Sequence, residues 1–510
     1  MIEAEVHQRL RDFLRAQGHH QWPHHLTMAR LVARALRVGR SALIQTGSAS
    51  AYCGYHRLSY LMPALIWPEP AVLVVPKLFH QRLVQVDIPN LLQSIPTVKA
   101  IQVGDRWPSP HFRGLLITSP EAWLSDQLQQ HNRFPRAIPT LIDGADDLET
   151  WVRSQLTHSL GAADWNALAL AYPAQQAFIR DMRVRLTHAV FQHPTNPYKC
   201  CLIDEPEQTL LLELLATLAE TPWQTDAMPD PWKNFWTQFQ QVDRLAWSQI
   251  DRIQGRFTLH CAPVEIASRL APLWEQQPIV LIGAAVDVDP QANVYRQQLG
   301  LGDLTCIKFA PNRQEDIVQL YLPDRLPLPN TSHFKDAALQ EIRPLLSLEQ
   351  DAPTVILVGD EPLKAQFGAI LAAEFGSRVQ VEKTDIAPNG ILVASWQFWQ
   401  THQLTVPAPG LLIMTTLPIP SLENPLVAGR VAYHKRLRQD WFRLYLLPEA
   451  MRALQLAIAS VRAHQGKIAL LDNRVNHRSY GRQILGALSP TARSNYFDID
   501  WLPTRFDQAL

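Results

Sequence analysis

The sequence contains few cysteines, and none of them are spaced as in a C-x-x-C motif. Its 510 residues contain five cysteines, at positions 53, 200, 201, 261 and 306. No C-x-x-C pair occurs, which argues against a disulfide framework, a zinc ribbon and a four-thiolate iron–sulfur site. Unpaired thiols are typical of a reducing compartment, so we expect a cytoplasmic protein.

Segments that would direct the chain to a membrane are also lacking. The first residues, MIEAEVHQRLRDFL, form a charged amphipathic pattern and not a secretory signal. No uncharged apolar run approaches the roughly 18–20 residues that a membrane span needs. We therefore expect no membrane partner.

An excess of charge of either sign is absent as well. There are 47 basic and 47 acidic residues, so the formal net charge is zero. This balance neither supports nor excludes a nucleic-acid partner, because binding needs only a local basic path. A hydrophobic content of 47% is ordinary for a globular protein, and 510 residues predict roughly two to four domains.

The sequence contains many short, continuous apolar runs, and helical patterns separate many of them. Runs of this kind are typical of parallel strands that are buried on both faces, so we predict an α/β fold. The predicted strands are 42–44, 71–76, 114–119, 140–144, 278–286, 354–360, 390–395, 410–418 and 467–472. The stretch 161–250 lacks such runs and predicts a helical insertion. The predicted organisation is a first domain over 1–160 that returns at 251–288, with the insertion between, and a second domain over 289–510.

Several segments, taken in order, resemble the DinG/XPD-type DNA helicases of superfamily two. They include HQRLVQVDIPNL (80–91), LIDGADDLE (141–149), LHCAPVEIA (259–267), WQFWQ (396–400), TTLPIPSLENPLVAGR (415–430) and KIALLDNRVNHRSYGRQIL (467–485). The resemblance implies two tandem RecA-like domains with an arch-like insertion in the first. It also implies ATP and Mg²⁺ as cofactors and single-stranded DNA as a partner.

The region that corresponds to the phosphate loop departs from the family pattern. In IQTGSASAYCGYHRLSYLMP (44–63), Gly47 and Gly54 are further apart than in GxxxxGK[ST]. His56 and Arg57 stand where the Lys and the Ser or Thr would be. Upstream, WPHHLTM has His25 at the position of the adenine-reading Gln. A histidine cluster over 19–25 has no carboxylate or thiolate at ligand spacing, so we expect no metal site there.

Other residues that the family uses for hydrolysis are also replaced. Asp143 matches the metal-associated Asp, but Gly144 stands at the catalytic Glu, and Gly-Ala-Ala (283–285) replaces Ser-Ala-Thr. In QLAIASVR (455–462), Gln455 and Arg462 match the last motif, whereas Ala459 replaces the arginine finger. These changes predict weak or lost ATP hydrolysis and argue against bound ATP and Mg²⁺. The stretch 91–114 is short and has no cysteine, so we expect no iron–sulfur cluster.

Candidate nucleic-acid contacts are basic and polar residues that the resemblance places on the domain surfaces: Lys77, Gln81, Arg82, Ser119, Lys435, Arg436 and Arg438. The last three lie in RVAYHKRLRQDWFR (430–443), where aromatic residues are interleaved with cations. A solvated helix whose aromatic side chains pack inward is the alternative interpretation of that stretch.

Three functions stay open from the sequence. The first is a nucleic-acid-binding protein with weak or lost ATP hydrolysis, and the second is an active but atypical ATP-dependent DNA helicase. The third is a helicase-derived scaffold that binds a protein partner, for example through the helical insertion.

Overall fold

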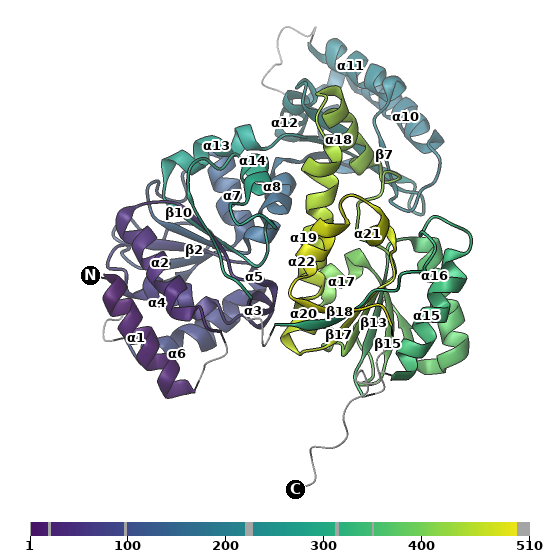
Figure 1. Ribbon diagram of the computed structural model, residues 1–510. Helices are drawn as coiled ribbons and strands as arrows, with labels where there is room; N and C mark the ends of the chain where they lie inside the picture. The colour runs from purple at the N-terminus through teal and green to yellow at the C-terminus, as the bar shows by residue number, and fades with distance from the viewer. Residues whose placement is uncertain are drawn as a thin grey trace.

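The computed structural model describes residues 2–18, 22–95, 99–219, 228–311, 316–348 and 351–496. It contains two parallel seven-stranded sheets that belong to two α/β domains lying side by side, with a third unit above them (Figure 1). The α/β prediction with two tandem domains is confirmed. Each of the nine apolar runs named above contains a strand.

The first sheet has the strand order β11-β1-β10-β5-β2-β4-β3. Its strands are β1 (Ala42–Gln45), β2 (Ala71–Val74), β3 (Ile101–Val103), β4 (Leu115–Thr118), β5 (Thr140–Asp143), β10 (Ile279–Gly283) and β11 (Thr305–Lys308). The central strands are buried on both faces, because Ala42 and Ile44 join one core cluster and Leu43 joins the other. One cluster includes α1 (Ile2–Gln17), α2 (His25–Val38), α4 (Arg57–Ile66) and α6 (Ile88–Leu92), and the other includes α7 (Pro120–Gln129), α8 (Leu148–Leu156), α13 (Ala267–Gln276) and α14 (Asn293–Leu299).

The second sheet has the order β14-β15-β13-β16-β17-β12-β18. Its strands are β12 (Val318–Tyr321), β13 (Thr354–Val358), β14 (Val379–Val381), β15 (Ile391–Ser395), β16 (Leu411–Met414), β17 (Lys467–Leu470) and β18 (Thr491–Ser494). One core cluster includes α17 (Trp396–His402), α19 (Leu447–Ala457), α21 (Arg474–His477) and α22 (Gly481–Leu488), and the other includes α15 (Phe334–Leu348) and α16 (Glu361–Phe375).

The chain leaves the first sheet later than the sequence predicted. Strand β11 pairs in parallel with β1, Ala42 facing Thr305, although it lies beyond the predicted boundary at 288. This strand has no clear signal in the sequence, because TCIK is a short edge strand that is partly exposed and not a buried apolar run. The first sheet therefore extends to Lys308.

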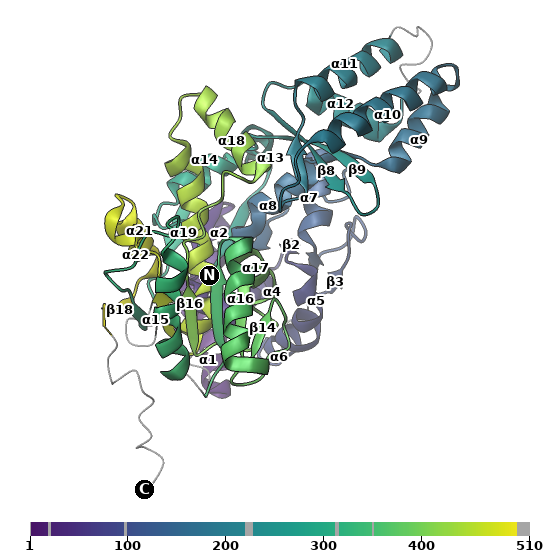
Figure 2. The ribbon, with the colours of Figure 1, turned by 90° about the vertical axis from the view of Figure 1, so that its right-hand side faces the viewer.

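The insertion also differs from the purely helical unit that was expected. Its helices α9 (Ala162–Ala171), α10 (Gln176–Gln192), α11 (Glu205–Ala219) and α12 (Asp230–Phe239) share a core with an antiparallel sheet in the order β6-β9-β8-β7. The strands are β6 (His158–Leu160), β7 (Cys200–Leu202), β8 (Arg244–Asp251) and β9 (Arg256–Pro263). Their apolar residues are interrupted by polar ones, since this sheet buries only part of its surface. Figure 2 shows this unit, called the arch from here on, projecting away from both domains.

The second domain contacts the arch through α18 (Pro425–Arg436), which packs against β7 and β8. A Cβ added at Gly429 would stand 2.4 Å from Cδ1 of Leu245, so a side chain there would require Leu245 to shift. Nη2 of Arg436 also donates to the carbonyl oxygen of Val242 at 3.3 Å. The first and second domains touch directly as well, because Nε2 of Gln298 donates to the carbonyl oxygen of Leu444 at 2.9 Å.

One helical stretch, Phe442–Ala463, is long and apolar enough to pass a test for membrane spans by length and composition. It comprises the π-helical turn η5 (Phe442–Leu446), α19 and α20 (Ala459–Ala463). Two thirds of its most apolar window is buried within the second domain, as in the core helix of a folded domain.

Candidate functional site at the domain interface

A short helix follows β1 at the position that corresponds to the phosphate loop. Gly47 turns the chain with φ +87°, α3 (Ser48–Cys53) follows, and Gly54 ends the helix with φ +75°. Helix α20 of the second domain packs on α3, and the rings of Tyr52 and His464 meet edge to face with centroids 6.1 Å apart. The space between the domains at this point is therefore occupied by the chain itself.

Asp143, at the end of β5, is held in a buried cluster. Its Oδ2 accepts a hydrogen bond from the Tyr60 hydroxyl at 2.7 Å, and its Oδ1 lies 3.0 Å from Nε2 of His56. An ionised carboxylate only accepts, so the His56 ring donates from Nε2. Nε of Arg57 lies 3.7 Å from Oδ2, and its guanidinium stacks 3.9 Å above the ring of Phe79 on α5 (Lys77–Arg82). His56, Arg57 and Asp143, which the sequence singled out, are thus brought together.

The electrostatics of this cluster favour the charged form of Asp143. Burial alone would raise the pKa of its carboxyl, but the interactions with His56, Arg57 and Tyr60 outweigh burial and hold the pKa below its usual value. Burial, followed by the charge of Asp143, raises the pKa of Tyr60 well above its usual range, so the phenol stays a donor. The cluster is a neutralised internal ion pair with both carboxylate oxygens in use.

Gly144 has a conformation and surroundings that exclude a longer side chain. Its φ is +102°, in the region that glycine favours, and an added Cβ would stand 2.7 Å from the Trp151 ring. The next carboxylate, Asp146, accepts from the backbone N–H groups of Ala284 and Ala285 at 2.6 and 2.8 Å. It therefore ties the end of β5 to the segment after β10, and no acidic side chain stands at the predicted catalytic Glu position.

Arg462 of α20 binds backbone of its own domain. Its Nη2 donates to the carbonyl oxygen of Leu488 at 2.7 Å and its Nη1 to that of Ser489 at 3.0 Å. Burial lowers the pKa of this guanidinium to about 10, although the nearby charge of Asp316 opposes the shift. Ala459, at the arginine-finger position, is buried. Neither position offers a free cation to a charge developing between the domains.

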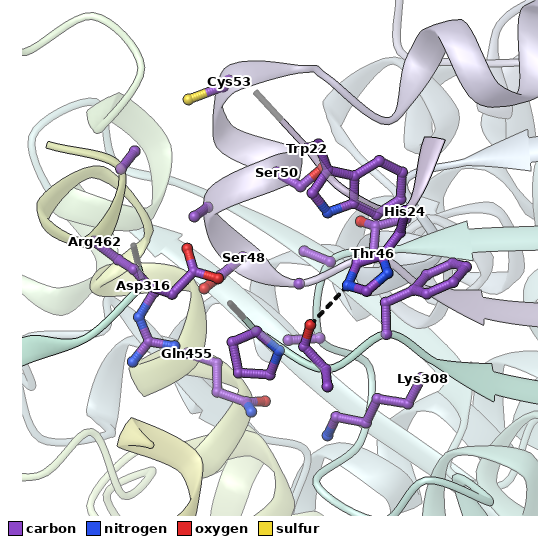
Figure 3. A pocket seen from close by; sticks show the side chains of 18 of the residues that line it. Trp22, His24, Thr46, Ser48, Ser50, Cys53, Lys308, Asp316, Gln455 and Arg462 are labelled. Carbon is purple, nitrogen blue, oxygen red and sulfur yellow. Dashed lines mark hydrogen bonds between the residues drawn. The ribbon is translucent and has the colours of Figure 1, made fainter. Parts of the chain in front are cut away.

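A cavity of about 720 Å³ lies beside this region and is lined by both domains (Figure 3). Trp22, His24 and Phe309 form its aromatic wall, with the His24 and Phe309 rings stacked 4.8 Å apart. Nε2 of His24 lies 2.9 Å from the carbonyl oxygen of Ala310. Of the predicted residues, Gly47, Gln455 and Arg462 line this cavity.

His56, Arg57 and Asp143 line a different space, a larger cleft between the domains. His25, at the predicted adenine-reading position, is buried, and its Nδ1 lies 3.0 Å from the Ser59 hydroxyl. His19 and His20 lie outside the described residues. The residues that a nucleotide would need together are thus divided between two spaces.

The arrangement differs from the open magnesium-triphosphate site that the phosphate-loop motif builds. The carboxylate at the metal-associated position accepts hydrogen bonds from Tyr60 and His56, and the short helix α3 stands where the phosphate loop is expected. Across the part of the chain that the structure describes, no group of three His, Cys, Asp or Glu side chains is arranged to hold a metal ion. Cys200, Cys201 and Cys261 are buried in the arch sheet, whereas Cys53 and Cys306 are partly exposed elsewhere.

The larger cleft has a volume of about 1930 Å³. Seven carboxylates and four arginines line it: Asp143, Asp146, Asp147, Asp360, Glu361, Glu423 and Glu449, with Arg57, Arg452, Arg474 and Arg478. Half-buried aromatic rings, among them Trp151, Trp441, Phe442 and Tyr480, complete its walls. The cleft is thus more acidic than basic, while its aromatic rings remain accessible.

The predicted nucleic-acid contacts fall into three places. Lys77, Gln81 and Arg82 are exposed on α5, at the rim formed by Leu78 and Phe79. Ser119 is fully buried and caps α7 by accepting from the N–H of Ala122 at 3.2 Å, so it is not accessible to a strand.

The third place is the end of α18, where the basic side chains are exposed and the aromatic ones are half-buried. Nζ of Lys435 lies 5.3 Å from the centre of the Trp441 ring, and Arg436 lies at the same distance over Tyr433. Trp441 and Phe442 also pack on the small core under α18. Arg438 is exposed with φ +56°. This geometry agrees with the alternative interpretation, in which the aromatic side chains pack inward.

Tyr60, Trp151 and Arg452 are site residues that the sequence did not predict. Tyr60 lies four residues after His56, a spacing that places both on one face of a helix and could have indicated their shared contact with Asp143. Arg452 on α19 donates to the carbonyl oxygen of Asp146 and so joins the two domains. No sequence signal marks that contact, since the acceptor is a backbone atom.

Comparison with known proteins agrees with this geometry. Residues 364–491 match the helicase C-terminal domain family. An ATP-dependent DNA helicase YoaA of Haemophilus influenzae is 22% identical over 254 residues, which are 47% of this chain and 40% of that protein. The 3'-5' exonuclease DinG of Bacillus subtilis is 22% identical over 283 residues, or 50% of this chain and 30% of that protein. The matches thus span two fifths or less of these relatives.

Solved structures match over more of the chain. An XPD helicase superposes with a TM-score of 0.58 at 11% identity, covering 92% of this chain and 99% of that one. The Xpd4 structure of S. tokodaii gives 0.57 at 11% identity, with 92% and 100% covered. At this identity the likeness concerns the fold.

Proposed function

We propose that this chain is a relative of the DinG/XPD-type helicases that binds nucleic acid and hydrolyses ATP weakly or not at all. The relatives are named as DNA helicases or as DinG, and the XPD helicase structure has the same fold as this chain. The nucleic-acid part of the proposal is supported by this likeness. The loss of hydrolysis is supported by the site.

The single observation that carries the loss of hydrolysis is the state of Asp143. Tyr60 and His56 donate to one oxygen of Asp143 each, and Arg57 lies 3.7 Å away, so the charge that would attract Mg²⁺ is already compensated within the protein. Releasing the carboxylate would leave a buried arginine without its anion, which is costly. In addition, Gly144 stands at the position of the Glu that orients water, and Ala459 at the position of the arginine that stabilises the developing charge. Both groups are therefore missing for the same reaction.

The test is ATP hydrolysis by the purified chain, with and without single-stranded DNA, alongside an Arg57→Ala variant. We expect no turnover above background in any of the four conditions. DNA-stimulated turnover of about 1 s⁻¹ or more, within the usual range for enzymes, would overturn the proposal if Arg57→Ala abolished it. Binding of the same DNA is measured in parallel by fluorescence anisotropy at several salt concentrations, because phosphate contacts are salt-sensitive.

A protein-binding scaffold is the second candidate, and two observations favour it. The cleft is lined by more carboxylates than cations, which is unfavourable for a phosphate backbone. The arch helices also expose large apolar side chains, with Leu170 75% and Val184 66% exposed. Failure to bind any oligonucleotide at low salt would favour the scaffold over the nucleic-acid-binding protein.

A further inference from the structure

A small pocket on the second domain is lined by three arginines and no carboxylate. It has a volume of about 460 Å³ and lies between α21, α22 and β18. Arg478, Arg482 and Arg493 line it, together with the amide of Asn476 and the hydroxyl of Ser479. These are all groups that can donate a hydrogen bond, which is the composition expected of a site for an anion.

Close packing of backbone fixes the position of these groups. A Cβ added at Gly481 would stand only 1.8 Å from the carbonyl oxygen of Val475, so the start of α22 presses on α21. This approach brings Arg478 and Arg482 to the same pocket from the two sides of the turn. Arg493 reaches it from β18, where its Nη2 donates to Oδ1 of Asn476 at 3.1 Å. Figure 1 shows α21 and α22 next to α19 in the second domain.

The positive charge of the pocket is not neutralised within the described residues. Arg478, Arg482 and Arg493 are exposed, and none of them has a carboxylate within 4.0 Å among those residues. Their neighbour Arg474 differs, because it forms a 2.5 Å contact with the buried carboxylate of Asp472. One arginine of this segment is thus used for structure, while three remain available to a ligand.

We propose that this pocket binds a phosphate group in the backbone of a single-stranded nucleic acid, an inference that rests on the nucleic-acid-binding function proposed above. Arginine is suited to phosphate because its planar fork donates two parallel hydrogen bonds. The pocket also adjoins the cleft, since Arg478 and Ser479 line both spaces.

The part of the cleft that the pocket adjoins offers aromatic surface. The rings of Tyr480 and Phe442 lie there with centroids 5.1 Å apart. A strand that stacks a base in this part of the cleft can place the neighbouring phosphate among the arginines. The acidic remainder of the cleft then directs the backbone outward to this pocket.

The experiment compares two triple variants that change net charge equally. The pocket variant carries Arg478→Gln, Arg482→Gln and Arg493→Gln, and the control carries Arg9→Gln, Arg11→Gln and Arg15→Gln on α1, at the other side of the molecule (Figure 1). Anisotropy of a labelled oligothymidylate gives Kd at several salt concentrations. A single Arg482→Gln variant accompanies them, because this exposed change leaves the fold intact.

For the pocket variant we expect Kd to rise about tenfold or more, from the loss of charge-assisted hydrogen bonds. The slope of log K against log salt should fall by about 0.7 for each phosphate that the pocket held, whereas a purely structural change would leave it unaltered. The α1 variant should match the unmodified chain in both quantities.

The outcomes separate the two proposals. If the unmodified chain binds no oligonucleotide at low salt, the proposed function fails. If it binds but the pocket variant equals the α1 variant in Kd and slope, the pocket inference is wrong while the function stands. Tight calorimetric binding of inorganic phosphate that oligothymidylate does not displace would identify a free anion as the ligand and overturn the inference.

Discussion

Removal of the Asp143 carboxylate should destabilise the first domain. Its oxygens bind the Tyr60 hydroxyl at 2.7 Å and His56 at 3.0 Å, and Arg57 lies 3.7 Å away, in surroundings where these side chains are less than a tenth exposed. Asp143→Ala would leave a buried guanidinium without its anion. Breaking a buried pair by removing one partner costs about 3–5 kcal/mol. Tyr60→Phe, which removes one hydrogen bond to the charge, should cost about 1.5–3 kcal/mol.

Guanidinium unfolding, followed by tryptophan fluorescence and far-ultraviolet circular dichroism, measures these losses. Asp181→Ala, an exposed change on α10, is the matched control and should stay within about 0.5 kcal/mol of the unmodified chain. The reasoning fails if Asp143→Ala unfolds at the same denaturant concentration as the control and instead abolishes a DNA-stimulated ATP hydrolysis. That result would mean that the carboxylate is free to bind a metal.

Three further outcomes can be checked. Gly144→Glu should destabilise the chain by about 1–3 kcal/mol or more, because φ of Gly144 is +102° and the Trp151 ring occupies the space that a side chain would need. The same variant should not restore hydrolysis, and a gain in ATP turnover would contradict this prediction. Burial raises the pKa of the Cys261 thiol to about 12, so iodoacetamide at pH 8 should label the partly exposed Cys53 and Cys306 before Cys261, as read by peptide mass spectrometry. The pKa of Asp143 is lowered on folding, so the stability that its carboxylate contributes is full above about pH 4 and is lost as the pH falls further. The difference in unfolding free energy between the unmodified chain and Asp143→Asn should therefore shrink below that pH. A difference that stays constant with pH would refute the assignment.

The central part of the fold could be predicted because its strands are buried on both faces. Runs such as AVLV (71–74) and TVILV (354–358) have no polar interruption, and the structure buries every one of their residues. Edge strands escaped prediction for the opposite reason. Strand β3 (IQV) leaves two of its three residues exposed, and the arch strands pack through only part of their surface, so neither produces a continuous apolar run.

The site was predictable in its residue types and not in its contacts. The resemblance singled out His56, Arg57 and Asp143, and the structure places His56 and Arg57 within 3.7 Å of the Asp143 carboxylate. The resemblance did not indicate that these three side chains compensate one another's charge, because that depends on how α3 extends the loop after β1 and orients α4. Arg462 kept its place in the motif but donates to backbone carbonyls, a role that sequence cannot distinguish from phosphate binding.

Because α18 of the second domain contacts the arch of the first, the two domains are connected at two places, directly and through the arch. The arch emerges from the first domain, and Gly429 of the second domain lies directly against Leu202 and Leu245 of the arch. A rotation that widened the cleft would have to slide α18 across β7 and β8, or bend the two chain segments that connect the arch to the first domain. We therefore expect domain rotation and arch tilt to be coupled, so that a spectroscopic label on the arch should report an opening of the cleft.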